Sequence, residues 1–486
     1  MESILKNIIL VTPEMFVLTM TCILLMVSVF LKSRVRETAY YLAQLTIVAT
    51  LGLTLYFLPK SGEVFSLDLH FVEDHFAVVM KLFIYAITFF VFLYARKEIE
   101  RLQLPAGEFY ALCLFSLLGM MVMVSANSTI LLFLGIELLS LPLYALVALY
   151  KRSHVGSEAA LKYFVTGAMA TGLLLYGLSL IYGATQSFTF NVIAQRMAQL
   201  PVSFDVVLVV GAVFVIAGLA FKLGLVPFHM WVPDVYEGAP VAVTLFLSSA
   251  PKIAVFGVIV RLLFEGMLQH HNEWQHFLVL LAVLSIGLGN LLAIAQSSIK
   301  RMLAYSSVAH VGYMVLGLIA GTEQGLSAGL FYIIIYAISA AGAFGIIILM
   351  SRVGLEINML SDFRGLNSRN PWLAFLMLVL LLSMAGIPPT AGFFAKFGVI
   401  MALVNVHLVW LAVFALVFAI IGAYYYLRVI KIMYFEQVEE NLAPVVVSPE
   451  LNAAVTINSL SVLLLGIFPG VLLDLCRASF GPGVLY

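Results

Sequence analysis

Long apolar runs, each separated from the next by a short polar segment, dominate the pattern of this chain. A membrane-spanning helix needs about 20 mostly apolar residues. None of the runs alternates between apolar and polar positions as the strands of a membrane barrel do. The pattern predicts a single polytopic all-α membrane domain over 1–486 with about fourteen spans, near 8–31, 39–58, 74–95, 107–125, 128–150, 156–183, 205–229, 237–265, 274–296, 301–321, 326–351, 371–400, 405–435 and 451–477.

Basic residues fall unevenly between the two sets of loops. Fifteen lysines and arginines lie in the odd-numbered loops, and only five lie in the even-numbered loops and at the two ends of the chain. Cytoplasmic loops carry the excess of basic residues in membrane proteins. The odd loops are therefore expected to be cytoplasmic, and both termini are expected on the periplasmic side.

The remaining basic residues all lie inside predicted spans, and all are lysines: Lys81, Lys162, Lys222, Lys252 and Lys396. A charge at the centre of a spanning helix costs about 2.5–3.5 kcal/mol even on the mildest scale. Burial lowers the pKa of a lysine in general, whereas an arginine stays protonated, so lysine is the better residue for a proton path. Lys81 has no obvious partner, and its side chain is expected to reach toward an interface.

Among the carboxylates, Glu137 is the one expected in mid-span, within TILLFLGIELLSLPLYALVAL. Ionisable groups at that depth usually serve function, but a structural ion pair between two helices is the alternative. Glu158 and Lys162 are four residues apart and share a helix face. For them a helix-end salt bridge and a working role are both open.

Helix-breaking residues accompany three of these lysines. Broken membrane helices occur where they line a cavity or are buried in protein, and in transporters they form ion sites. Lys222 precedes one break and Lys396 follows another, whereas Lys252 directly follows a proline. The predicted breaks are at Gly224, Pro227, Pro251, Gly386, Pro388 and Pro389.

The two longest breaks lie five helices apart, in helices seven and twelve. This spacing predicts two inverted five-helix repeats, over 107–265 (helices four to eight) and 274–435 (helices nine to thirteen). The lysine and the break swap order between the two copies, which the repeat does not explain. His310 lies mid-span between the halves, where it is either a proton relay or a hydrogen-bonded packing residue.

Composition excludes several classes of protein. The chain is 63% hydrophobic and 10% charged, with a formal net charge of zero, which argues against a nucleic-acid partner. Its three cysteines form no CxxC pair, so an iron–sulfur cluster held by this chain alone is not expected. No phosphate loop, dinucleotide fingerprint, zinc motif or nucleophile elbow is present. The chain alone is expected to hold no metal or cofactor and to do no covalent chemistry.

Five stretches carry a family resemblance: LLFLGIELLSLPLYALVAL, EAALKYF, FKLGLVPFHMWVPDVYEGAP, IKRMLAYSSVAHVGY and GIPPTAGFFAKF. With the count of fourteen helices, they make the chain resemble the antiporter-like membrane subunits of respiratory complex I, which are similar to subunits of multisubunit sodium/proton antiporters. Lys396 stands where one sibling subunit typically has a glutamate, and the long C-terminal extension of another sibling is lacking. These features favour a third sibling type.

The resemblance implies a role for each of six residues in proton translocation. It implies that Glu137 is the carboxylate that pairs with Lys222, that Lys252 is a bridging lysine and that Lys396 is the terminal one. Lys162 matches the lysine of the family's KYF segment, and His310 matches a polar link along the central axis.

The resemblance also implies the surroundings of the chain. Flavin (FMN) and iron–sulfur clusters are expected in partner subunits, and NADH and quinone, such as ubiquinone, are expected as substrates of the whole assembly. The expected partners are the other membrane and peripheral subunits of complex I and the lipid bilayer, in a bacterial inner membrane.

The hypothesis from these residues is proton translocation by electrostatic coupling. Opening a Glu137–Lys222 pair would push a proton along Lys252 and His310 toward Lys396, with the path running in the plane of the membrane. Two alternatives stay open at this point: a subunit that exchanges sodium for protons, and a scaffold whose buried charges only hold helices together.

Overall fold

A computed structural model of the chain describes residues 9–30, 35–58, 62–199, 205–351, 356–436 and 447–480. In this part of the chain thirteen helices are long and apolar enough to cross a membrane. Two shorter apolar helices, α17 (Pro371–Ala385) and α18 (Ala391–Asn405), together occupy the predicted twelfth span. The prediction of an all-helical, multi-pass membrane protein is confirmed, and the count of fourteen spans stays a prediction.

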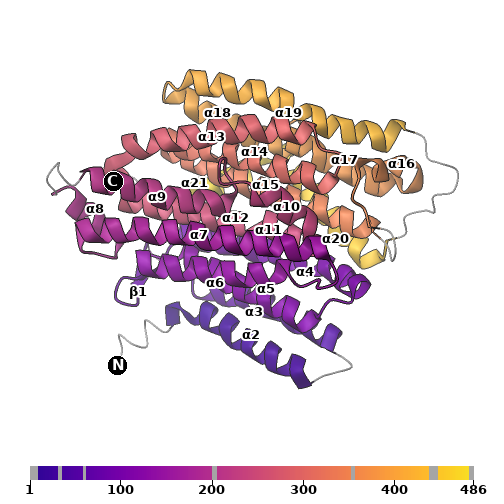
Figure 1. Cartoon of the computed structure of the whole chain (residues 1–486), viewed down its shortest axis with the longest axis horizontal. Coiled ribbons are helices and arrows are strands. Elements are labelled where there is room, and N and C mark those ends of the chain that lie inside the picture. Colours follow the sequence, from indigo (N-terminus) through magenta and orange to yellow (C-terminus); the bar gives the residue numbers. More distant parts are fainter. Residues whose placement is uncertain are drawn as a thin grey trace.

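The first part of the chain forms the lower half of the molecule in Figure 1. One short antiparallel hairpin lies in the second loop and pairs Val64 with Glu73. The elements of this part are α2 (Thr12–Phe30), α3 (Val35–Tyr56), β1 (Val64–Ser66), β2 (Phe71–Glu73), α4 (His75–Leu102), α5 (Ala106–Val124), α6 (Thr129–Val147), α7 (His154–Thr185), α8 (Phe190–Met197), α9 (Asp205–Leu223), α10 (Trp231–Gly238), α11 (Val241–Ser248), α12 (Ala250–Val260), the π-helix η2 (Arg261–Gly266) and the 3₁₀ helix η3 (Leu268–His270).

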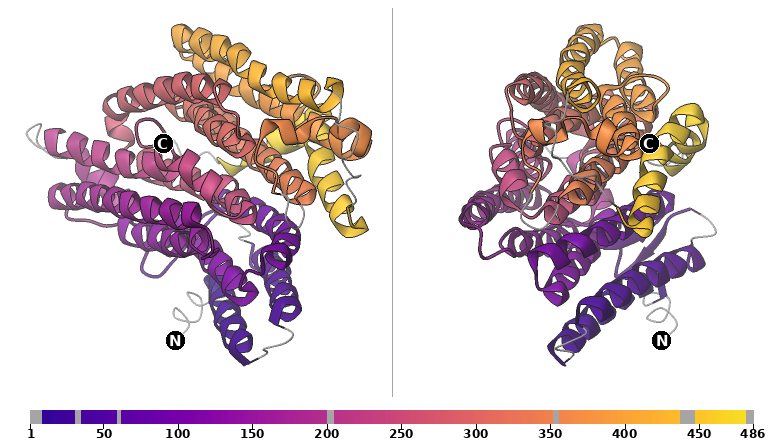
Figure 2. Two further views of the ribbon diagram at one scale, coloured as in Figure 1. Left: turned by 45° about the vertical axis from the view of Figure 1, so that its right-hand side comes forward. Right: turned by 90° about the vertical axis from the view of Figure 1, so that its right-hand side faces the viewer.

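The second part of the chain continues the array to its other end. The helices run roughly parallel in Figure 1, and both views of Figure 2 keep the indigo helices at one end and the orange helices at the other. The remaining elements are α13 (His271–Ile294), α14 (Ile299–Ala320), α15 (Glu323–Met350), η4 (Leu360–Phe363), α16 (Leu366–Arg369), α17, α18, α19 (Val409–Phe435), α20 (Pro449–Ile467) and α21 (Pro469–Ser479).

Short polar side chains fix where many of these helices begin. Each accepts a hydrogen bond from a backbone N–H of the first turn, which has no partner within the helix. In the apolar core this matters more than in water, because no solvent satisfies the free N–H groups there. The caps are Asp74 for α4, Ser128 for α6, Ser153 for α7, Ser298 for α14, Thr322 for α15 and Asn370 for α17.

The core of the bundle is built around α14, α15 and the segment Val241–Gly266, all of which are almost completely buried. The last two helices return from the orange end, because α20 packs on α15, α17 and α18 and α21 packs on α15 and α4. Neighbours in the chain therefore stack side by side along the array, while α15 runs through its middle. A row of groups on successive helices accordingly extends along the array rather than across it.

Two predicted boundaries are wrong, each for a local reason. The predicted seventh span continues to residue 229, but α9 ends at Leu223 because Gly224 adopts a left-handed conformation with φ of +77°. The predicted last span, 451–477, divides into α20 and α21 at Phe468 and Pro469. Proline starts the second helix since it needs no N–H partner in a first turn.

Candidate functional site

Lys222 lies one residue before the end of α9, at the first interrupted helix. Its Nζ donates hydrogen bonds to Ser140 Oγ at 2.6 Å and to the Tyr144 hydroxyl at 3.2 Å, both on α6. Beyond it, Gly224 turns the chain away and the backbone is not helical again until Trp231, whose Nε1 donates to the Phe221 carbonyl at 2.9 Å. The ammonium group is therefore held, just before the break, by two hydroxyl groups of a neighbouring helix.

Glu137 lies one turn before Ser140 on α6 and is half-buried. Its Oε1 accepts a hydrogen bond from the Thr171 hydroxyl of α7 at 2.8 Å. Among the described residues no base lies within 4.0 Å of this carboxylate, so the expected ion pair with Lys222 is not formed in this conformation. The Ser140 hydroxyl holds Lys222 and the Thr171 hydroxyl holds Glu137, so the two charged groups stay apart.

Lys222, Lys252, His310 and Lys396 follow one another along the array, and we call them the row. Lys252, its second member, lies at the start of α12. Helix eight is interrupted before it, since α11 ends at Ser248 and α12 begins at Ala250, with Pro251 in its first turn. The Lys252 ammonium contacts the Ser307 hydroxyl of α14 and lies 5.0 Å from the centroid of the Tyr336 ring. A cation over an aromatic face is stabilised by the ring quadrupole.

His310 lies one turn beyond Ser307 on α14 and is buried. Its Nδ1 is 2.8 Å from the Tyr332 hydroxyl of α15, and its Nε2 is 2.9 Å from the Tyr426 hydroxyl of α19. A neutral imidazole donates from one nitrogen and accepts at the other, so either tautomer satisfies both contacts. The ring of Tyr336, which also faces Lys252, lies 4.9 Å from the imidazole.

Lys396 ends the row, in the helix that follows the second interruption. Its Nζ donates to the carbonyl of Ala385, the last residue of α17, at 2.8 Å. Gly386, with φ of +84°, ends α17, and α18 resumes after Pro388 and Pro389 at Ala391. Although Lys396 follows the break in sequence, its side chain therefore reaches back to a carbonyl group that the break has freed. Lys222, by contrast, points from before its break to another helix.

A small cavity joins His310 to this second break. It has about 10 Å³ of space for water, close to the least that one water molecule requires, and its polar lining includes Ser339, Ser383, Tyr332 and Tyr336. Gly392 and Ala395, which precede Lys396 by four residues and by one, complete its wall. The cavity is placed where a single water would bridge the histidine to the helix that carries the last lysine.

Lys162 does not belong to this buried row. Its side chain is half-exposed and forms ion pairs with Glu158 at 2.8 Å and with Asp234 at 2.9 Å. Asp234 also pairs with Arg301 at 3.1 Å. Burial alone would raise the pKa of Asp234, but the hydrogen bonds and charges of Lys162 and Arg301 outweigh it and lower that pKa. The network ties the start of α7 to α10 and to the start of α14.

The prediction for Lys81 is wrong. The side chain is completely buried, and its Nζ lies 2.7 Å from Glu14 Oε1 and 2.6 Å from Glu73 Oε2. Two carboxylates near helix ends are also buried, Glu14 in the first turn of α2 and Glu98 close to the end of α4. The sequence did not reveal these partners, since Glu14 lies on a distant helix and Glu73 lies in the preceding hairpin, outside the helix that carries Lys81.

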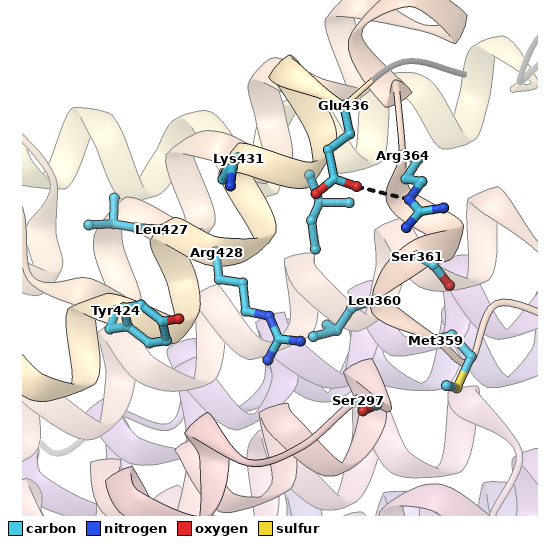
Figure 3. A pocket seen from close by; sticks show the side chains of 11 residues that line it. Ser297, Met359, Leu360, Ser361, Arg364, Tyr424, Leu427, Arg428, Lys431 and Glu436 are labelled. Carbon is cyan, nitrogen blue, oxygen red and sulfur yellow. Dashed lines mark hydrogen bonds and ion pairs between the residues drawn. The ribbon is translucent and has the colours of Figure 1, made fainter. Parts of the chain in front are cut away.

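A wider pocket of about 640 Å³ opens at the end of α19, near η4. Figure 3 shows Arg364, Arg428, Lys431 and Glu436 around it, and a dashed line joins Arg364 to Glu436, whose atoms lie 2.8 Å apart. Tyr426, which holds His310, lies only two residues before Arg428 on α19. This polar pocket thus lies at the same end of α19 as the tyrosine that contacts the buried row.

No candidate metal site is found in the described part of the chain. There, no three histidine, cysteine, aspartate or glutamate side chains come together in a way that could hold a metal ion. Cys113 and Cys476 are buried and Cys22 is exposed, and none of the three forms a disulfide. The candidate site therefore consists of ionisable and hydroxyl side chains alone.

The row of buried lysines beside broken helices defines a class of ion-translocating membrane subunits, and comparisons with known proteins identify the family. Residues 126–422 match the family described as NADH:quinone oxidoreductase/Mrp antiporter, TM. The chain belongs to this family of antiporter-like membrane subunits, as the resemblance in its sequence predicted.

Individual relatives narrow the comparison. NADH-quinone oxidoreductase subunit N of Coxiella burnetii is 52% identical over 99% of this chain and 100% of its own length. The protein of that name from Thioalkalivibrio sulfidiphilus is 49% identical over 96% of this chain and 97% of its own length. The chain is thus similar to subunit N along nearly its full length.

Solved structures agree with the fold. A chain of respiratory complex I from Thermus thermophilus is 30% identical, with a TM-score of 0.79 over 95% of this chain and 99% of its own length. A chain of the Mrp complex from Dietzia sp. is 21% identical, with a TM-score of 0.86 over 99% of this chain and 100% of its own length. At that identity the second likeness concerns the fold alone.

Proposed function

We propose that this chain is subunit N of a bacterial NADH–quinone oxidoreductase and that it translocates protons when the complex passes electrons from NADH to quinone. One observation carries the proposal: the partly buried Lys222 and the buried Lys252, His310 and Lys396 lie on four helices along the array, and each has a polar contact with a neighbouring helix. Ionisable groups inside membrane helices are rare, and they usually mark an ion pathway.

The first step is a change of partner at Lys222. In the conformation described here, Ser140 and Tyr144 hold the ammonium and Thr171 holds Glu137. Rotation of the lysine side chain toward Glu137, one turn away on α6, would replace neutral partners by a carboxylate. At close range in a poorly solvated site such a change is worth several kcal/mol, enough to load or release a proton.

Hydroxyl groups then continue the path. Ser307 contacts Lys252 and lies 3.4 Å from the Tyr236 hydroxyl, and His310 follows on the same helix. Tyr426 bridges His310 and Ser306. Hydroxyl groups donate and accept at once, so they transfer protons between groups that do not touch. The small cavity beside His310 supplies the place for a water on the way to Lys396.

Matching hydrogen bonds support the two inverted repeats, 107–265 and 274–435. Ser128 caps α6 and forms an antiparallel bridge with Thr189, and Ser298 caps α14 and forms the same bridge with Met359. The two bridges span equal lengths of chain. Because α6 begins after an even loop and α14 begins after an odd one, equivalent caps would face opposite sides of the membrane, as inversion requires.

The repeat also bears on why Lys222 precedes the break in helix seven whereas Lys396 follows the break in helix twelve. Gly224 and Gly386 end the first half of helices seven and twelve with the same left-handed geometry. Counted from these glycines, Asp234 stands where the second copy has Lys396. We infer that the two breaks are equivalent while the charges placed around them are not.

The surroundings of the chain follow from the same proposal. In this proposal FMN and iron–sulfur clusters belong to partner subunits, and NADH and quinone bind elsewhere in the complex. The odd loops face the cytoplasm of a bacterial cell with an inner membrane. Both termini face the periplasm, although residues 1–8 and 481–486 lie outside the described part of the chain.

The test is Lys222→Ala in the intact complex, reconstituted into vesicles, with proton uptake measured per NADH oxidised. We expect fewer protons per NADH, because the row loses the group at which the partner exchange occurs. Lys151→Ala is the matched control, since Lys151 is exposed in a loop and outside the row. An unchanged ratio in Lys222→Ala would remove this residue from the path.

A scaffold would behave differently. Glu137→Gln should then reduce the amount of assembled complex but leave the protons moved per NADH by each assembled complex unchanged. Our proposal predicts the opposite result: a normal amount of assembled complex and fewer protons moved per NADH.

Sodium/proton exchange is distinguished by ion replacement. The family's description includes Mrp antiporters, and Mrp-type chains share this fold. Proton uptake that is unaffected by replacing sodium with potassium supports proton translocation, whereas a requirement for sodium supports exchange.

A further inference from the structure

A second group of charges, all but one of them buried, lies away from the row, where the β1–β2 hairpin meets α2, α4 and η2. It contains four carboxylic acids and two bases. The members are Glu14 on α2, Glu73 at the end of β2, Asp74 at the N-cap of α4, Lys81 on α4, and Arg261 and Glu265 in η2. We call it the hairpin cluster.

One half of the hairpin cluster is centred on Lys81. The side chains of Lys81, Glu14 and Glu73 have exposures of only 0%, 4% and 6%. The ammonium lies between the two carboxyl groups, and Glu73 Oε2 also accepts a hydrogen bond from Ser125 at 3.1 Å. Both oxygens of Glu14 are buried and lack a hydrogen-bond partner, although Oε1 is within ion-pair distance of Lys81. One cation thus serves two carboxyl groups, and Glu14 is the less satisfied of the two.

The other half is centred on Arg261. Its Nη2 donates to Asp74 Oδ1 at 2.7 Å, and its Nη1 donates to Glu265 Oε1 at 2.7 Å. Asp74 Oδ1 also accepts the Ala77 N–H at 2.8 Å, as the cap of α4. Asp74 is therefore held by a guanidinium group and a helix N-terminus, both of which favour its ionised form.

Charge balance requires the hairpin cluster to retain a proton. Glu265 is partly exposed and lines a pocket, so three carboxylates and two cations are fully buried. Three ionised carboxylates against two cations would leave one uncompensated negative charge in the interior, which is strongly unfavourable. The pKa values of the adjacent acids Glu73 and Asp74 shift in opposite directions, which favours Glu73 as the one that retains the proton. Burial raises the pKa of Glu73 even though Lys81 opposes it, whereas the pKa of Asp74 is lowered because Arg261 and Ala77 outweigh its burial.

The hairpin cluster has access to solvent on one side. A pocket of about 520 Å³ is lined by Arg261 and Glu265 of the hairpin cluster, by Val72, the neighbour of Glu73, and by polar side chains that include Asn127 and Gln195. These residues come from the second, fourth, sixth and eighth loops or the helix ends beside them, all on the side opposite the basic loops. Protons would reach the hairpin cluster from that side.

We propose that Glu73, with Glu14 across Lys81, forms a proton-binding site that exchanges its proton with this pocket. The groups that face Glu73 are Glu14 from α2, Lys81 and Tyr85 from α4, Ser125 after α5, and the Asp74–Arg261–Glu265 triad. The site is separated from the proposed proton row, because Lys252 and Arg261 are nine residues apart on one helical segment, or roughly 13 Å. It does not depend on the proposed function.

Infrared spectroscopy of the purified intact complex during a pH titration tests the site without any electron transfer. The wild-type-minus-Glu73→Gln difference should contain the carbonyl stretch of a protonated carboxylic acid, which disappears as the pH rises. In heavy water the band should shift, since the site exchanges with the pocket. Asp68→Asn is the matched control, because Asp68 lies in the same hairpin but is exposed, and its difference should contain no such band.

A second variant keeps the test decisive if Glu73→Gln fails to assemble. Ser125→Ala removes a hydrogen bond to the ionised form of Glu73, so the titration midpoint of the band should move up by about one pH unit. Absence of the band from the Glu73→Gln difference, no shift in heavy water, or an unmoved midpoint in Ser125→Ala would each overturn the proposal.

Discussion

Glu98 gives the sharpest test of how this fold is held together. It is a completely buried carboxylate on α4, and it accepts hydrogen bonds from the backbone N–H groups of Val241 at 3.0 Å and Ala242 at 2.5 Å. These are the first two residues of α11, whose own N-cap residue, Pro240, has no side-chain hydrogen bond to offer. A residue far away in the sequence therefore caps the helix that leads to Lys252.

The perturbation is Glu98→Ala, and its size follows from the two donors that lose their acceptor. Each buried N–H left without a partner costs about 1–3 kcal/mol, so the first turn of α11 should be destabilised by about 2–6 kcal/mol. Loss of the negative charge at a helix N-terminus acts in the same direction. At about 1.4 kcal/mol per factor of ten, opening of this turn should become at least about 30-fold more frequent.

Hydrogen–deuterium exchange of the purified complex measures this opening directly. Peptides that cover 241–248 should exchange at least about 30-fold faster in Glu98→Ala than in the wild type. Glu100→Ala is the matched control. Glu100 lies on the same helix, but its side chain is exposed and its contact with Arg36 is long, at 4.0 Å. Equal exchange of 241–248 in wild type and Glu98→Ala would refute the capping role.

Two further predictions concern the row and the surface network. Tyr426→Phe removes a hydroxyl group that contacts the buried histidine, so protons moved per NADH should fall at least about two-fold, whereas the exposed Tyr424→Phe should have no effect. Because the pKa of Asp234 is lowered by Lys162 and Arg301, its stabilisation is present above the pKa of an ordinary aspartate and is lost as the pH falls through the lowered value. Thermal denaturation of the complex should therefore depend less on acid pH in Asp234→Asn than in wild type.

Much of the architecture could be read from the chain itself. Apolar runs of sufficient length predict membrane helices because lipid leaves no other partner for backbone groups. The interruptions in helices seven and twelve could be located because Gly224 and Gly386 are followed closely by prolines, which cannot continue a helix. The lysines of the row stood out for a similar reason, since charge is rare in apolar runs.

The partners of those charges were not available from the sequence. Lys222 was expected to pair with Glu137, but Ser140 and Tyr144 hold it instead, and a hydroxyl group on an apolar helix carries no distinguishing signal. Tyr332 and Tyr426 were missed for the same reason.

Sequence by itself thus determined that this chain spans the membrane and that helices seven and twelve break, and it singled out Lys222, Lys252 and Lys396. Only the tertiary structure decided what each charge touches: Glu14 and Glu73 around Lys81, and Glu98 at the start of α11. The physical reason is the distance along the chain over which each kind of interaction acts. Hydrophobicity and backbone conformation act over a few neighbouring residues, whereas a hydrogen bond between two helices depends on how the whole bundle brings their faces together.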